Sequence, residues 1–158
     1  MDIRFACDRG IPGMIRLLQQ VGQVHHEIRP DLFRAGAQKY DEAALAALLK
    51  DPTRPILIAE QDGNVAGYAF CIFQKVQNDN VLCDRKVLYI DDLCVDENCR
   101  GQKIASRLYE RVLAFAKEQG CNFITLNVWS GNDGAMAFYE RVGLKPRSVT
   151  MDMPLEDF

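Results

Sequence analysis

The sequence predicts a single mixed α/β domain, antiparallel in the first half of its sheet and with a parallel crossover near the end of the chain. An Asp-Gly pair at residues 62–63 separates two apolar, β-leaning runs, which is a strong signal for an antiparallel hairpin. Farther along, a stretch with helical apolar spacing lies between two strand-like runs, as a parallel crossover requires. The length of 158 residues fits one domain, which we expect to span residues 1–158.

The other elements follow from apolar spacing and from residues that start or stop helices. Apolar residues recur at helical spacing over 11–21, with Asp8 as a candidate N-cap and Pro12 in the first turn. Asp41 can cap a second helix, rich in Ala and Leu, that runs through Leu49. The remaining expected elements are strands at 3–6, 56–60, 65–73, 87–95, 123–128 and 149–153, helices from 104 to near 120 and at 135–141, and a polar loop over 74–86.

Composition and charge exclude several classes of protein. Hydrophobic residues make up 48% and charged residues 26% of the chain, which are ordinary values for a globular domain. The formal net charge of −3 lacks the basic excess of a nucleic-acid-binding protein, so we expect no nucleic-acid partner. No apolar run approaches the length of a membrane span, and the first residues lack the basic and apolar regions of a signal peptide.

The six cysteines do not have the spacing of a metal site or a disulfide framework. No Cys-x-x-Cys pair occurs, and Cys94 and Cys99 have no histidine nearby. Most of the cysteines lie in apolar runs and fit small buried side chains. We therefore expect no metal ion, and a reducing, cytoplasmic location.

A strand-like run over 87–95 continues through a short polar turn directly into the helix that starts near residue 104. The first turn of a helix carries backbone N–H groups without internal partners, and the helix dipole adds partial positive charge there. Gly101 lets the backbone turn, and Arg100 and Lys103 add positive charge beside these amides. The segment suits a phosphate-bearing cofactor, although an ordinary strand-to-helix connection fits the residues equally well. The glycine-rich signatures of dinucleotide and ATP sites are absent from the sequence.

Two motifs resemble the hallmarks of the GNAT superfamily of N-acetyltransferases. Residues 100–105, Arg-Gly-Gln-Lys-Ile-Ala, are similar to its acyl-CoA signature (Q/R)xxGx(G/A), with Lys103 in place of the first glycine. Residues 132–144 resemble its second hallmark, an Asn, a short helix containing Phe-Tyr-Glu, and then Gly with a large apolar residue. The two motifs occur in the family's order, each after a strand, and the resemblance covers nearly the whole chain.

The resemblance implies a fold and a co-substrate. The fold is a mixed, largely antiparallel central sheet with flanking helices, in which the fourth and fifth strands splay apart to form a cleft. The co-substrate is acetyl-CoA, whose pantetheine arm lies in the cleft and pairs with the fourth strand like an added strand. The implied cofactor-binding residues are Leu93, Cys94 and Val95 for the arm, Arg100, Gly101, Gln102, Lys103, Ile104 and Ala105 for the pyrophosphate, and Asn132 and Tyr139 near the arm and its sulfur.

The implied reaction, attack of an amine on a thioester, needs an acid and a base. An amine with a pKa of about 10 is almost wholly protonated at pH 7, so a base must remove a proton. The leaving thiolate needs a proton, which a tyrosine hydroxyl can donate, and Tyr139 is the candidate acid. Its alternative role is that of a packed aromatic side chain beside Phe138.

Asp91 and Asp92 are the candidates for the base. Adjacent strand residues point to opposite faces, so one of the pair should face the amine unless a bulge re-aims both. The run over 89–95 is similar to the Leu-Glu-Asp-Phe-type run of polyamine and other small-amine acetyltransferases. This similarity implies that Asp91 is the base, acting through water, and that Asp92 attracts the cationic acceptor. A solvated or capping aspartate is the alternative for each.

The identity of the amine acceptor is the property that the sequence determines least. A small amine or a polyamine-like acceptor is favoured, while a protein N-terminus, a lysine side chain or a non-catalytic acyl-CoA-binding role remain alternatives. Ribosomal-protein N-terminal acetyltransferases share the hallmarks, but some carry a glutamate base on the fifth strand where this chain has Asn127. His25 and His26 lie in the region expected to wall the acceptor site, as substrate lining, a weak metal site or simply a polar helix end. The resemblance also makes a homodimer possible.

Overall fold

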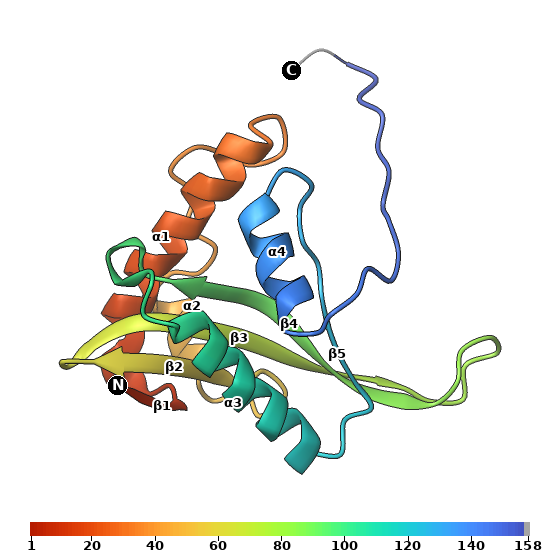
Figure 1. Ribbon diagram of the computed structural model, residues 1–158, viewed down its shortest axis with the longest axis horizontal. Helices are drawn as coiled ribbons and strands as arrows, with labels where there is room; N and C mark the ends of the chain where they lie inside the picture. Colours follow the sequence, from red (N-terminus) through yellow and green to blue (C-terminus); the bar gives the residue numbers. More distant parts are fainter. Residues whose placement is uncertain (157–158) are drawn as a thin grey trace.

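The computed structural model describes residues 1–156 and contains one five-stranded sheet in the order β1-β2-β3-β4-β5 (Figure 1). The strands are β1 (Asp2–Phe5), β2 (Ile56–Gln61), β3 (Asn64–Val76), β4 (Arg85–Val95) and β5 (Phe123–Leu126). Neighbouring strands pair antiparallel except for β4 and β5, which are parallel. The mixed, largely antiparallel sheet expected from the sequence is therefore confirmed.

Four helices cover the two faces of the sheet (Figure 1). On one face, α1 (Ile11–Ile28) and α2 (Glu42–Leu48) bury side chains against β2 and β3. On the other face, α3 (Ile104–Glu118) packs along the sheet, and apolar residues of α4 (Asp133–Arg141) pack against the same cluster. Two short 3₁₀ turns, Asp8–Gly10 and Glu97–Cys99, precede α1 and α3.

The alternating strand pattern divides the core into two clusters, one on each face of the sheet. The cluster under α3 contains Leu57, Ala59, Ala66, Ala69, Cys71, Leu88, Ile90, Ile104, Leu108, Tyr109, Val112, Phe115 and Ala116. The cluster under α1 and α2 contains Met14, Leu17, Leu18, Leu45, Ile56, Ile58, Val65, Tyr68 and Phe70. Adjacent residues of β2 enter opposite clusters, as a sheet buried on both faces requires.

Several expected boundaries agree with the structure and others do not. Asp41 caps α2, because its Oδ1 accepts a hydrogen bond from the amide of Ala44 at 2.8 Å. Asp8 does not cap α1, since it starts the 3₁₀ turn and the N-cap is Gly10. The helix also continues past Val21 to Ile28, because nothing in residues 22–28 breaks the helical backbone before Pro30.

The C-terminal half contains three further differences. The loop expected over 74–86 is shorter, since β3 and β4 extend their antiparallel pairing out to Val76 and Arg85. Strand β5 ends at Leu126, two residues before the expected end. The strand expected over 149–153 does not form, because these residues are exposed and pair with no strand within residues 1–156.

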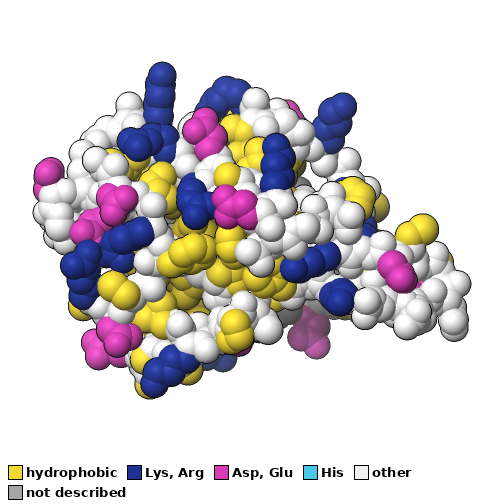
Figure 2. Space-filling model, turned by 90° about the horizontal axis from the view of Figure 1, so that it is seen from below, with side chains coloured by type: hydrophobic (Ala, Val, Ile, Leu, Met, Phe, Trp, Pro, Cys, Tyr) yellow, Lys and Arg dark blue, Asp and Glu magenta, His cyan; other side chains and the backbone are white. Residues whose placement is uncertain are grey.

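The surface carries charges of both signs. On the face shown in Figure 2, Lys and Arg side chains are spread among Asp and Glu side chains around an apolar area. The protrusion to the right in Figure 1 is the far end of the β3–β4 hairpin. Within residues 1–156, no helix is long and apolar enough to cross a lipid bilayer.

Candidate active site

The two parallel strands separate halfway along β4. Pairing with β5 joins Val87–Ile90 to Phe123–Leu126, and β4 then continues to Val95 without a partner on that side within residues 1–156. On its other side, β4 stays paired with β3 as far as Val95. The backbone of Leu93, Cys94 and Val95 thus lies on a strand segment with one free edge, as the expected splay requires.

A β-bulge in β4 brings the two expected carboxylates to one face of the sheet. Phe70 pairs with Asp92 and Cys71 with Ile90, so Asp91 is the extra residue of β4. Asp92 contacts Tyr68 of the cluster under α1 and α2. Asp91 contacts Lys39, in the connection between those same helices. The alternation of a regular strand would instead have sent the two side chains to opposite faces.

Asp92 has the environment of a carboxyl group that titrates near neutral pH. Its Oδ2 accepts a hydrogen bond from the Tyr68 hydroxyl at 2.5 Å. Burial raises the pKa of Asp92 to about 6, even though the Tyr68 hydrogen bond and the Lys39 charge act in the opposite direction. Above pH 6 the carboxylate is therefore mostly ionised and able to accept a proton.

Asp91 is held by a primary ammonium group. The Lys39 Nζ lies 2.7 Å from Asp91 Oδ2, and the Asp91 side chain is 16% exposed. Burial alone would lower the pKa of Lys39, but the contact with Asp91 raises it above its ordinary value. The side of the site nearest α1 and α2 therefore already accommodates one ammonium against one carboxylate.

Tyr139 of α4 lies close enough to Asp92 for the charge of that carboxylate to act on its phenol. Burial raises the pKa of the Tyr139 phenol above its ordinary value, and the nearby Asp92 carboxylate raises it further. The phenol consequently stays protonated at neutral pH, as a proton donor must. Burial similarly raises the pKa of the Cys94 thiol to about 12, so this thiol remains neutral.

The turn between β4 and α3 exposes the residues expected to bind pyrophosphate. Arg100, Gly101, Gln102 and Lys103 are exposed, and α3 begins at the buried Ile104 without a side-chain cap on its first turn. Gly101 has a φ of 81° and Lys103 a φ of 59°, so both occupy the left-handed region. A left-handed residue followed by a helical one points successive amides into the same concavity. The glycine of the acyl-CoA signature would suit position 103, and Lys103 adopts that conformation at some cost in strain.

A second glycine lets α3 approach the sheet closely. A Cβ atom on Gly67 would lie 3.0 Å from both the carbonyl oxygen of Cys94 and the Leu108 side chain. Leu108 and Ile104 of α3 could not pack where they do against a larger residue. Gly67 therefore helps to set the position of the first turn of α3 relative to β4.

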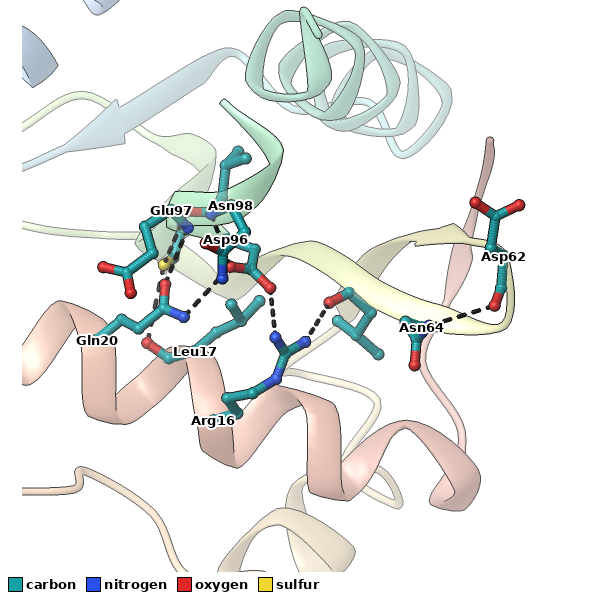
Figure 3. Close-up of polar contacts among 11 residues, drawn as sticks. Arg16, Leu17, Gln20, Asp62, Asn64, Asp96, Glu97 and Asn98 are labelled. Carbon is teal, nitrogen blue, oxygen red and sulfur yellow. Dashed lines mark hydrogen bonds and ion pairs between the residues drawn. The ribbon is translucent and has the colours of Figure 1, made fainter. Parts of the chain in front are cut away.

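Asp96 ties the end of β4 to α1 (Figure 3). It is 3% exposed and accepts one charge-assisted hydrogen bond from Arg16, one hydrogen bond from Gln20 at 3.3 Å and one from the Asn98 amide at 3.0 Å. Arg16 also donates to the Val65 carbonyl oxygen at 3.0 Å. Burial would raise the pKa of Asp96, but these bonds outweigh it and keep the pKa below its ordinary value. Because Asp96 is held against α1, the exposed turn over residues 100–103 begins from a residue whose position is fixed.

The other expected site residues occupy less direct positions. Asn132 is the N-cap of α4, and its Oδ1 accepts from the Ala135 amide at 3.4 Å, which leaves its side-chain nitrogen for other contacts. Asn127 donates to the Tyr89 hydroxyl at 3.0 Å. The His25 ring lies 4.9 Å from that of Phe33 between centroids, in a tilted arrangement, and burial lowers the pKa of its imidazole. In residues 1–156, no group of three or more His, Cys, Asp or Glu side chains is placed to hold a metal ion.

Sequence reasoning missed three contributors to the site. Tyr68 fixes Asp92, Lys39 fixes Asp91, and Arg16 fixes Asp96. Tyr68 looks like any core residue of an apolar strand, and the two basic residues lie far from their partners in the sequence. The bulge in β4 fulfils the condition stated in the sequence analysis under which both carboxylates share a face.

Comparisons with known proteins agree with this geometry. Residues 21–144 match the family described as Acetyltransferase (GNAT) family. The chain is 28% identical over 132 residues to the thialysine N-epsilon-acetyltransferase of Bos taurus, covering 81% of this chain and 68% of that protein. It is 26% identical over 102 residues to a putative [ribosomal protein bS18]-alanine N-acetyltransferase of Bacillus subtilis, covering 65% and 61%.

A solved structure is similar over the whole fold. A mutant form of a Bacillus halodurans protein superposes with a TM-score of 0.94 at 29% identity, covering 99% of this chain and 100% of that one. Among the curated relatives, the matched stretch spans only 44% to 61% of the length of two of them. The family match, by contrast, includes the splayed strands, the turn before α3 and the second motif. The chain therefore belongs to the acetyltransferase (GNAT) family.

Proposed function

We propose that this chain transfers an acetyl group from acetyl-CoA to the primary amine of a small molecule. The observation that carries the proposal is the bulge that places Asp91 and Asp92 on one face, next to the free edge of β4, with Asp92 within electrostatic reach of Tyr139. This arrangement supplies a base, a proton donor and a second anionic group in one place. A protein that only bound acyl-CoA would need none of the three.

In this proposal, acetyl-CoA occupies the free edge of β4. Amides and carbonyls of Leu93, Cys94 and Val95 pair with the pantetheine arm, as a peptide pairs with an exposed strand edge. The pyrophosphate accepts hydrogen bonds from the amides of residues 100–105 and interacts with the partial positive charge of the first turn of α3. The free side-chain nitrogen of Asn132 is available to the arm.

Asp92 is the base in this proposal, and Tyr139 is the acid. A carboxylate with a pKa of about 6 is ionised at neutral pH and still basic enough to take a proton from the acceptor nitrogen, directly or through water. The nitrogen attacks the thioester carbon, the C–N bond forms, and the C–S bond breaks. The leaving thiolate takes the proton of the Tyr139 hydroxyl, and the second N–H proton of the acceptor returns to the Tyr139 oxygen, directly or through water.

Asp91 then recognises the cationic acceptor, which reverses the roles implied by the resemblance alone. Its contact with the Lys39 Nζ supports this assignment, because the carboxylate already holds a primary ammonium in the structure. An acceptor with a second amine could compete with Lys39 for Asp91 while its reacting amine lies near Asp92. The similarity to a thialysine acetyltransferase supports a small amine of this kind.

An N-terminal peptide amine is the second candidate acceptor. The similarity to a ribosomal-protein alanine acetyltransferase supports it, although Asn127 cannot act as a base. A lysine side chain of a protein would satisfy the same chemistry. The six cysteines are all free thiols, which fits the reducing cytoplasmic location that we include in the proposal.

Thiol release from acetyl-CoA, measured across panels of diamines, amino acids and short peptides, tests the proposal. We expect turnover with small amines and a fall in kcat of about 10²-fold in Tyr139→Phe, the scale of an acid–base group. Tyr89→Phe removes a hydroxyl that contacts Asn127 and serves as the matched control. Turnover on peptides alone would support the second candidate. Binding of CoA with no turnover on any acceptor would refute the enzymatic proposal.

A further inference from the structure

Lys39 and Asp91 place one positive and one negative charge side by side at the edge of the candidate active site. Lys39 belongs to the connection between α1 and α2, and Asp91 is the extra residue of the bulge in β4. The Nζ of Lys39 lies 2.7 Å from the Oδ2 of Asp91, and the two side chains are 49% and 16% exposed. The proposed reaction uses Asp91 to attract the acceptor but gives Lys39 no role.

A single hydrogen bond holds this pair, so both partners keep unused bonding capacity. An ammonium group has three donors, and a carboxylate has about four acceptor positions. Within residues 1–156, the Lys39 Nζ donates only to Asp91, and the Asp91 carboxylate accepts only from Lys39. The Arg29–Asp31 pair differs, because two hydrogen bonds at 2.9 and 2.7 Å join its partners. Of these two pairs, the one at Asp91 is therefore the one that can open to admit another charged group.

This pair adjoins the proposed base. The positive charge of Lys39 reaches Asp92, where it counteracts the rise in the pKa of that carboxyl group. Asp92 follows Asp91 directly in β4, and the bulge brings both side chains to one face of the sheet. A small molecule can therefore contact the pair with one end and present an amine to Asp92 with the other.

The balance of charges decides which group fits the pair best. In the proposed reaction, the reacting ammonium of the acceptor balances Asp92, so Lys39 and Asp91 are left as a neutral couple. A second ammonium alone would put two cations beside Asp91, and a carboxylate alone would put a second anion beside it. Like charges brought together weaken binding. A group that carries both charges on one carbon avoids both penalties, because its ammonium can face Asp91 while its carboxylate faces Lys39.

We propose that the acceptor is an amino acid with an amine at the end of its side chain, and that Asp91 and Lys39 bind its head group. Asp91 binds the α-ammonium, Lys39 binds the α-carboxylate, and the side-chain amine lies near Asp92. This inference rests on the proposed acetyl transfer and names the acceptor class for it. Lys39 is then a specificity-determining residue, and its flexible stem lets its ammonium move from Asp91 to the incoming carboxylate.

Four amines that share the same reacting end test this assignment on the full chain. Lysine carries both head-group charges, cadaverine lacks the carboxylate, ε-aminocaproate lacks the α-ammonium, and pentylamine lacks both. The measurement is kcat/KM for formation of the amide at the shared end. We expect lysine to exceed both cadaverine and ε-aminocaproate by about tenfold, the scale of a hydrogen bond between charged groups.

Two variants should change these preferences in a crossed pattern. Lys39→Met removes the positive charge and should lower the ratio of lysine to cadaverine by about tenfold. Asp91→Asn should lower the ratio of lysine to ε-aminocaproate by about the same factor. Lys50→Met removes an exposed lysine just after α2, and as the matched control it should change neither ratio. A merely structural effect would lower kcat/KM for all four amines together.

The possible outcomes separate this inference from the proposed function. No acetylation of any small amine would refute the proposed function, and this inference with it. Acetylation of small amines without a preference for lysine over pentylamine would refute the head-group site alone. Variants that lower kcat/KM for all four amines by one common factor would show that Lys39 and Asp91 do not recognise the head group, which would overturn the assignment as well.

Discussion

Replacing Asp96 by asparagine and Arg16 by methionine, singly and together, measures how firmly the end of β4 is held against α1. The Asp96 side chain is 5% exposed and the Arg16 side chain 46% exposed, so the pair lies between a buried and a surface ion pair. Surface pairs contribute about 0–1 kcal/mol, and hydrogen bonds to charged groups about 1.5–3 kcal/mol. We therefore expect a coupling energy of about 1–2 kcal/mol between the two substitutions.

Urea unfolding of the four proteins gives this coupling energy as the departure from additivity. The Arg111–Glu118 pair of α3, at 4.0 Å with both side chains partly exposed, is the control. The same cycle there, with Arg111→Met and Glu118→Gln, should give a coupling close to zero. Equal coupling energies in the two cycles would refute the reasoning, because burial of Asp96 would then have no measurable effect.

The same cycle has a pH dependence whose sign is fixed by the environment of Asp96. Its pKa in the folded protein lies below the ordinary value of 3.8. The ionised, hydrogen-bonded carboxylate therefore contributes stability above pH 3.8, and this contribution is lost as the pH falls through the lowered pKa. The coupling energy measured at pH 7 should accordingly shrink in acid. A coupling that stayed constant down to pH 2 would contradict an ionic origin.

Three other predictions follow from the site. Gly67→Ala should destabilise the fold by about 1–3 kcal/mol in urea unfolding, because its Cβ meets Leu108 at 3.0 Å, and no loss would show that α3 shifts freely. Lys103→Gly relieves a left-handed lysine and should bind CoA at least as tightly in calorimetry, whereas a loss above tenfold would make the lysine charge the dominant contribution. For Asp92, whose pKa is raised to about 6, kcat/KM should fall as the pH drops below 6, and Asp92→Asn should abolish this limb of the profile. Loss of this limb in Asp91→Asn together with its persistence in Asp92→Asn would exchange the two roles.

Local sequence signals predicted most of the fold. The Asp-Gly turn placed the hairpin of β2 and β3, Asp41 placed the start of α2, and apolar spacing placed α3 within a few residues. These features depend on interactions between residues close in sequence, which a single sequence reveals. The failed N-cap at Asp8 is different in kind, since the choice between Asp8 and Gly10 depends on how the chain leaves β1.

The sequence predicted which residues belong to the candidate site but not which distant side chains contact them. Asp91, Asp92 and Tyr139 were chosen from the sequence, and their contribution to catalysis remains a prediction. Their partners Tyr68 and Lys39 are 24 and 52 residues away along the chain, and only the packing of β3 and of the α1–α2 connection brings them close. The prediction of a strand over 149–153 was wrong for a related reason. Strand formation requires a neighbouring strand to pair with, and the residues of the segment itself do not reveal whether one is present.

The bulge in β4 means that Asp91 could be removed without changing the pairing of the other residues of β3 and β4. Because Asp91 has no partner on β3, deleting it would restore a regular ladder and leave Asp92 opposite Phe70. If Asp91 contacts the acceptor as proposed, relatives could gain or lose that anionic contact by a single-codon insertion or deletion, with the residues proposed to bind acetyl-CoA unchanged. In the proposed mechanism, the charge of the preferred acceptor could then change independently of the groups assigned to the thioester chemistry.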